Sequence, residues 1–257
     1  MTLFEAVAAA LRVVTLSVWL VAGALNAGAQ TYAPLDAQYF AGRPADALAG
    51  YEALLARDST NINVLWRAAR AAIVIGFLAD RQDPESPMYL RAESFARTMV
   101  AHNPDGVEGH YWLAAALGRR ALRADLRTAA RLGSATWESA NRALAIDSAH
   151  AGAHDVIGKL HSEVCKLPYV IRFIAGRLLG MSVVRSTSWE QGERHLRRAV
   201  ELDSTMILYR LDLAELYMRT SRKAEAIRLL NEVLLLPRIQ PFDARLQRDA
   251  AEMLHSR

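Results

Sequence analysis

The segment Arg210–Pro237, RLDLAELYMRTSRKAEAIRLLNEVLLLP, contains the clearest folding signal in the chain. Its apolar residues follow a helical period on both sides of a short polar turn. The first half places Leu213, Ala214 and Tyr217 on one helix face. The second half has small Ala226 where a neighbouring helix can approach closely. The pattern predicts two antiparallel helices, the second of which ends at the final proline.

The same pattern returns upstream, so we expect a stack of helix pairs. One such pair cannot bury both of its apolar faces alone and therefore occurs in arrays. No stretch of the sequence shows the alternation that is typical of a half-buried strand. The sequence predicts an all-α fold, an α-solenoid of irregular helix-turn-helix repeats. The upstream repeats are marked by Ala92, Ala96, Met99 and Pro104 with a partner over 61–79; by Leu113, Ala114 and Leu117 with Thr136, Ala140 and Ala143; and by His154, Ile157, Gly158 and His161 with Gly192, Leu196 and Ala199.

The array has expected boundaries at both ends. A half-repeat marked by Ala47, Tyr51 and Leu54 begins it. A capping helix over 241–256 ends it, with acidic residues on the side that faces water. These acidic residues are Asp243, Asp249 and Glu252.

Two helical insertions are expected to interrupt the repeats, around 119–131 and over 169–181. With these insertions, residues 30–257 form one repeat domain. Its length and its 52% hydrophobic composition are sufficient for a buried core.

Residues 1–29 have the composition of a targeting segment. Arg12 is the only charged residue between positions 6 and 29, and an apolar run covers 13–25. The triplet Ala27-Gly28-Ala29 before Gln30 fits a signal-peptide cleavage site, which favours export to the periplasm or outside the cell. The alternative is an uncleaved membrane anchor, because the apolar stretch is long enough to span a bilayer.

Charge and cysteine content exclude several function classes. The net charge of +4 is mildly basic, and neither a phosphate-binding loop nor an RNA-binding signature appears, so no nucleic-acid partner is expected. One cysteine, Cys165, cannot form an intramolecular disulfide and is too few for a structural metal cage. A nucleophilic role for Cys165 would need an orienting residue that the sequence does not reveal, so we interpret it as a small buried hydrophobic residue.

His150 and His154 lie one helical turn apart near Glu163, which is a conceivable arrangement of metal ligands. His154 and His161 also occupy large-residue packing positions of the repeat, so core packing is the preferred interpretation. We expect no metal, no cofactor and no catalytic residues.

The sequence contains two candidate interaction surfaces apart from the groove. Arg119, Arg123, Arg127 and Arg131 recur at every fourth position and could form one basic stripe for an acidic peptide or an anionic lipid surface, or an ordinary solvated face. The apolar, arginine-containing segment 169–181 could lie on a membrane, grip a partner helix or fill the inner face of the array.

The repeat pattern resembles the tetratricopeptide repeat over residues 44–237. Three further segments, GHYW at 109–112, IGKLHSEV at 157–164 and LAELY at 213–217, look like the regulator of microtubule dynamics family. Members of that family are irregular tetratricopeptide proteins with an N-terminal hydrophobic segment, and bacteria have relatives of unknown role. The resemblance covers about residues 88–257 and implies a scaffold. It does not extend to the microtubule association of animal members, because an exported chain would meet no microtubules.

In tetratricopeptide arrays the first helix of each repeat lines the concave groove that binds peptides. On this resemblance, the groove is expected to bind an unidentified peptide or protein partner, and the protein is a non-enzymatic scaffold. A membrane-tethered structural protein, held by an uncleaved N-terminal helix, is the alternative. The expected groove residues are Tyr111, Asp155, Lys159, Glu215 and Met218.

Overall fold

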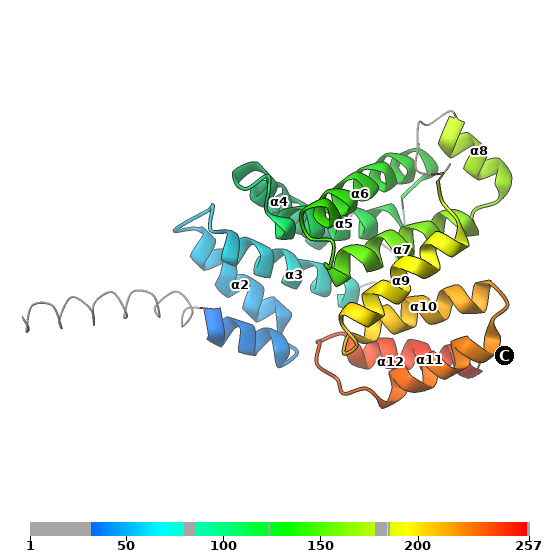
Figure 1. Ribbon diagram of the computed structural model, residues 1–257. Coiled ribbons are helices and arrows are strands. Elements are labelled where there is room, and N and C mark those ends of the chain that lie inside the picture. The colour runs from blue at the N-terminus through cyan, green and yellow to red at the C-terminus, as the bar shows by residue number, and fades with distance from the viewer. Residues whose placement is uncertain (1–31, 80–85, 123, 178–183, 185, 256–257) are drawn as a thin grey trace, which may run out of the picture.

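The computed structural model describes residues 32–79, 86–122, 124–177, 184 and 186–255 (Figure 1). The expected targeting segment over 1–29 lies outside the described residues. All regular structure in the described part of the chain is helical, which confirms the predicted all-α fold. In chain order the helices are a helix over 32–40, α2 (Pro44–Leu55), α3 (Ile62–Ala79), α4 (Pro87–His102), α5 (Val107–Ala121), α6 (Leu126–Ile146), α7 (Ala151–Lys166), α8 (Tyr169–Arg177), α9 (Trp189–Leu202), α10 (Ile207–Arg219), α11 (Lys223–Leu235) and α12 (Asp243–His255).

The helices pack as antiparallel pairs in the predicted order. The pairs are α3 with α4, α5 with α6, α7 with α9, and α10 with α11. The first helices of successive pairs, α3, α5, α7 and α10, also contact one another, and α10 contacts α12. These first helices form the inner layer of the solenoid, and their partners form the outer layer (Figure 1).

An aspartate begins the turn that leads into α3 and two of the turns between successive pairs. In each turn its carboxylate accepts a hydrogen bond from the backbone N–H two residues later. The distances are 3.2 Å at Asp58, 2.9 Å at Asp147 and 2.9 Å at Asp203. This bond closes a tight local turn and prevents the outer helix from continuing.

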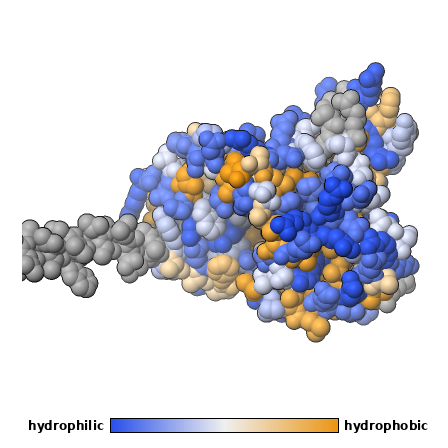
Figure 2. Space-filling model, viewed as in Figure 1, coloured by the Kyte–Doolittle hydropathy of each residue, from blue (hydrophilic) through white to orange (hydrophobic). Residues whose placement is uncertain are grey.

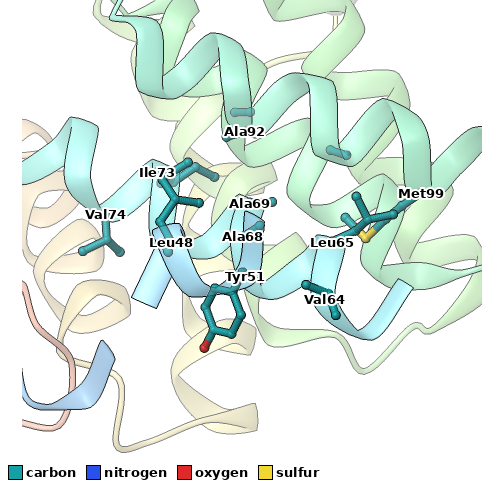
Figure 3. Packing of buried hydrophobic residues seen from close by; sticks show 14 of the residues in the cluster. Leu48, Tyr51, Val64, Leu65, Ala68, Ala69, Ile73, Val74, Ala92 and Met99 are labelled. Atoms are coloured by element: carbon teal, nitrogen blue, oxygen red, sulfur yellow. The ribbon is translucent and has the colours of Figure 1, made fainter. Parts of the chain in front are cut away.

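Buried alanines allow the helices of the N-terminal repeats to approach closely. Ala68 and Ala69 on α3 are completely buried between α2 and α4 (Figure 3). Tyr51 of α2 and Met99 of α4 complete this core. Among the described helices, α3 is also apolar and long enough to cross a bilayer, but half of that stretch is buried inside the fold, as is typical of a core helix.

The pair α7 and α9 makes a particularly close crossing. A Cβ atom on Gly158 would lie 2.6 Å from Cγ of Leu196 and 3.0 Å from the carbonyl oxygen of Gly192. The two helices can therefore touch at this crossing only because both positions lack a side chain.

The two ends of the array touch each other. The Tyr39 hydroxyl donates a hydrogen bond to the Gln240 side chain at 3.2 Å. The rings of Phe77 and Phe242 meet edge to face, with their centroids 6.0 Å apart. The Arg245 guanidinium lies over the Phe77 ring and donates a hydrogen bond to the backbone carbonyl oxygen of Phe77. These contacts link the end of α3 with α12, so the solenoid closes around its inner layer.

The structure differs from the sequence-based expectation at two places. Residues 119–131 do not form a separate inserted helix, because they end α5 and begin the long α6. Asp243 does not face water as expected. It is buried, and its carboxylate accepts hydrogen bonds from the backbone N–H groups of Ile239 and Gln240. Its short side chain therefore satisfies two backbone N–H groups of the turn that precedes α12.

Candidate functional site

The inner layer surrounds a cavity of about 600 Å³. Helices α3, α5, α7 and α10 contribute most of the wall, while Ala175 of α8 and Leu246 of α12 close it at other sides. Four of the end-to-end contact residues also line it, namely Tyr39, Phe77, Gln240 and Phe242. A cavity of this size is comparable to ordinary ligand pockets.

Four of the five expected groove residues line this cavity. Tyr111, Asp155, Lys159 and Glu215 meet there from α5, α7 and α10. Met218 does not line the cavity, and its side chain packs on the apolar cluster that α10 shares with α11 and α12. It lies one turn beyond Glu215, in the last turn of α10. The binding role of the other four stays a prediction.

Lys159 is the centre of a charge cluster in the cavity wall. Its Nζ lies 2.5 Å from Oδ1 of Asp212, 2.6 Å from Oε2 of Glu215 and 3.8 Å from Oε1 of Glu163. Burial disfavours the charged form of Lys159, but Asp212 and Glu215 outweigh it and raise the pKa of the amine. Lys159 is therefore charged and occupied by its own carboxylates.

Sequence reasoning did not identify Asp212. The available signal was a charged residue three positions before Glu215 inside an otherwise apolar repeat. Two carboxylates at that spacing lie on one helix face and can share a single lysine.

Asp155 lies in the same wall but has a different environment. It is 6% exposed, and its Oδ1 atom has no hydrogen-bond partner among the described residues. Burial and, second, the negative charge of Asp212 raise the pKa of Asp155 well above its ordinary value, although Lys159 and Arg119 act against this. Asp155 is therefore a buried carboxyl group that holds its proton to a higher pH than an exposed aspartate does.

We expect Asp155→Asn to raise the midpoint of thermal unfolding at pH 8. The folded protein holds the Asp155 proton more tightly than the unfolded chain does, so the contribution of this group to stability falls as pH rises above its ordinary pKa. Asparagine keeps the shape of the side chain and cannot ionise, so it removes this loss of stability at high pH. The measurement is thermal denaturation followed by circular dichroism.

Glu215→Gln is the matched control for this carboxyl-to-amide change. Burial opposes the charge of Glu215, but Lys159 lowers its pKa, so this substitution removes a favourable pair. It should destabilise the protein by about 1 kcal/mol. If Asp155→Asn destabilised the protein as Glu215→Gln does, the Asp155 carboxyl would be a stabilising group.

The expected basic stripe does not lie on one helix. Arg119 belongs to α5, where its guanidinium lies over the Phe77 ring in the cavity, with 5.0 Å to the ring centroid. Arg127 and Arg131 are exposed on α6, beyond the break between the two helices, and Arg123 lies outside the described residues. The four-residue spacing of these arginines runs from the end of α5 into α6, so it does not reflect one helix face. Asp125 caps the start of α6 by accepting hydrogen bonds from the backbone N–H groups of Arg127 and Thr128.

Comparison with known proteins agrees with this architecture. A family model described as "Regulator of microtubule dynamics protein 1-3" matches residues 35–257. The chain belongs to the regulator of microtubule dynamics family. The family resemblance predicted from the sequence is thereby confirmed. No curated protein sequence matches this member of the family.

Solved structures resemble this family member in fold. TTC0263, a thermophilic tetratricopeptide protein in Thermus thermophilus, has a TM-score of 0.63 and 21% identity, covering 88% of this chain and 97% of that one. MamA has a TM-score of 0.43 and 13% identity, covering 85% of this chain and 96% of that one. The first likeness confirms the tetratricopeptide fold of this regulator of microtubule dynamics family member.

Three histidines meet between α7 and α9 of this family member. Nδ1 of His154 lies 2.9 Å from Nδ1 of His195, and the ring of His195 stacks on that of His161 with centroids 6.1 Å apart. His161 is 1% exposed and accepts a hydrogen bond from the Ser188 backbone N–H. Sequence reasoning missed His195, because it is 41 residues away from His154 and its spacing within α9 carries no signal.

The metal-ligand hypothesis finds no geometric support. His150 caps the start of α7 by accepting from the backbone N–H of Ala153, while Glu163 pairs with Lys166. In the described part of the family member, no group of three or more His, Cys, Asp or Glu side chains is arranged to hold a metal ion.

The His195 environment predicts a loss of stability on mild acidification. Burial and the neighbouring His154 lower the pKa of His195 to about 4, whereas an unfolded histidine titrates near 6.5. A histidine kept neutral stabilises the fold above pH 6.5, and that contribution is lost as pH falls towards 4. Between pH 7.5 and 5, His195→Gln should show a shallower fall of the unfolding midpoint than the unchanged protein. His255→Gln, at an exposed site, should keep the original slope.

Cys165 and α8 complete the residues singled out by the sequence. Cys165 is half-buried, and burial raises the pKa of its thiol, which is the opposite of what a nucleophile needs. On α8, Ala175 packs into a small core with Ala130 and Val164. The outer side of α8 exposes Tyr169, Val170 and Phe173.

Helix α8 stands apart from the packed body of the solenoid (Figure 1). The face drawn in Figure 2 is mostly hydrophilic, with hydrophobic side chains in small scattered groups, and α8 projects from the body of the molecule (Figure 1). The helix therefore combines a narrow core-facing side with an exposed apolar side. Residues 178–181 of the expected insertion lie outside the described residues.

Proposed function

We propose that this protein is a non-enzymatic interaction scaffold that holds an extended peptide, or a segment of a partner protein, in its central cavity. The observation that carries the proposal is the cavity itself. Its wall brings together Tyr111, Asp155, Lys159 and Glu215 from three helices that are distant in sequence. The helices that present these side chains are already packed, so a flexible segment would bind without ordering the scaffold.

The test is site-specific photo-crosslinking in cells that express the full chain. A benzophenone amino acid replaces Leu122, which is half-exposed in the cavity wall, or Leu235, which is 86% exposed at the end of α11. We expect a discrete protein adduct from position 122 and not from position 235.

A cavity-filling variant provides the control. Ala129 and Ala145 both lie on α6, but only Ala129 lines the cavity, while Ala145 is exposed. Ala129→Phe should abolish the adduct formed from position 122, and Ala145→Phe should leave it unchanged. An adduct that survives Ala129→Phe would contradict binding inside the cavity.

The proposal includes export to the periplasm or out of the cell, with no nucleic-acid partner. The apolar run and the cleavage pattern in residues 1–29 support export. N-terminal sequencing of the protein made in its natural host tests it. Gln30 as the first residue is the expected result, and Met1 would instead indicate the anchored alternative.

The exposed side of α8 favours membrane association as a second candidate. Tyr169, Val170 and Phe173 lie beside Arg172 and Arg177, a combination that suits an anionic interface. Flotation with vesicles that contain anionic lipid should then be lost in Phe173→Ser. Flotation that is unchanged by this substitution would contradict a role of α8.

A further inference from the structure

The cavity wall contains one carboxyl group that the protein itself leaves without a partner. Asp155 is more than nine-tenths buried, faces the cavity, and its Oδ1 atom accepts no hydrogen bond from any described residue. Buried polar atoms in folded proteins almost always have a partner, since an unsatisfied one lowers stability. A ligand that donates a hydrogen bond to Oδ1 would supply this missing partner.

The charge of the wall indicates what kind of donor fits. Its acidic residues outnumber its basic residues, although the whole chain has a net charge of +4. Of the basic residues, Lys159 is occupied by Asp212 and Glu215, and Arg70 is occupied by Asp36. The acidic residues of the wall are Glu108, Asp155, Glu163, Asp212, Glu215 and Asp249, and the basic ones are Arg70, Arg119 and Lys159.

We propose that Asp155 binds an alkyl ammonium or guanidinium group, and that the occupant of the cavity is a segment with a lysine or arginine side chain. This inference rests on the proposed function and names the chemistry of the partner. The positive group adds the charge that the wall lacks and makes a charge-assisted hydrogen bond with Oδ1. An acidic segment would meet one guanidinium, that of Arg119, and several carboxylates.

Proton exchange accompanies the binding of the cation. Burial raises the pKa of Asp155 in the empty cavity, where Arg119 faces it from α5, Lys159 from its own helix, and Asp212 and Glu215 from α10. A bound ammonium favours the ionised carboxylate, and a proton that Asp155 holds passes to water as the ammonium binds. Affinity for the cation should therefore increase as pH rises from 5 to 8.

The first experiment selects peptides from a randomised heptapeptide display library on the full chain. We expect enrichment of lysine or arginine at one position on the unchanged protein. This preference should disappear on Asp155→Asn, which keeps the size of the side chain. It should persist on Glu163→Gln, which changes another carboxyl of the wall that is already paired with Lys166.

The second experiment measures affinity by fluorescence anisotropy for the selected peptide and for its copy with norleucine in place of the cation. We expect the norleucine copy to bind about tenfold more weakly to the unchanged protein. Asp155→Asn should weaken the binding of the cationic peptide by about the same factor and leave the affinity for the norleucine copy unchanged. The rise in affinity with pH should also be absent from Asp155→Asn.

The outcomes separate this inference from the proposed function. Enrichment of acidic or wholly apolar peptides would overturn the cation site and leave a peptide scaffold in place. Failure of every peptide to bind would overturn both. If only the free diamine 1,5-diaminopentane bound, with the same dependence on Asp155, the ammonium site would stand and the peptide function would fall.

Discussion

Gly158→Leu should lower the midpoint of thermal unfolding by about 10 °C. The added side chain begins at a Cβ that is 2.6 Å from Cγ of Leu196 and 3.0 Å from a backbone oxygen of α9. Helix α7 has to move away from α9, because the Gly192 carbonyl cannot change its rotamer as a side chain would. Overpacking of this kind costs about 3 kcal/mol, and a chain of this size loses a few degrees for each kcal/mol.

The same substitution at Gly118 is the matched control. A Cβ on Gly118 would have only ordinary contact with Thr136, at 3.5 Å, and the rest of a leucine could extend into the cavity. Gly118→Leu should change the free energy of unfolding by less than about 1 kcal/mol. Equal losses in the two variants would show that α7 and α9 do not depend on the glycine crossing.

Phe242→Ala should destabilise the protein by about 3 kcal/mol and loosen both ends of the array. The Phe242 ring contacts Phe77 and packs on both of the large apolar clusters, the N-terminal one and the C-terminal one. Removing it takes away the ring contact between the end of α3 and the start of α12. Hydrogen exchange read by mass spectrometry should become faster in both helices, although they are far apart in sequence.

Leu235→Ala serves as the comparison, since this leucine is 86% exposed and outside the contact between the ends. Its effect should stay within about 0.5 kcal/mol. If Phe242→Ala accelerated exchange only in α12, the contact between the ends would not stabilise α3.

The repeats could be predicted because their signal is local. Positions such as Leu213, Tyr217 and Ala226 repeat the same apolar spacing, and each helix pair needs only its own residues and its neighbours to form. The cavity residues Asp155, Lys159 and Glu215 followed from the repeat register for the same reason. Local spacing did not show that Met218, one turn beyond Glu215, packs on the C-terminal apolar cluster, because that contact depends on residues of α11 and α12.

The contact between the ends could not be predicted in this way. The position of Phe242 relative to Phe77 depends on the summed rotations of all the helix pairs between them, and a local sequence pattern does not give that sum. The pairing of His154 with His195 and the burial of Asp243 depend in the same way on neighbours from other helices. The unpartnered state of Asp155 likewise became visible only when its surroundings were known.

Closure of the array constrains how this protein can change in length during evolution. An open solenoid can gain or lose a repeat by duplication or deletion, because each unit contacts only its neighbours. Here an extra pair between α3 and α12 would move Phe77 away from Phe242, much as an extra strand alters the diameter of a closed barrel. Extra sequence fits instead where it projects from the closed array, as in α8, which is inserted between α7 and α9. A change in the number of repeats would therefore break the contact between the ends, whereas an insertion such as α8 leaves it in place.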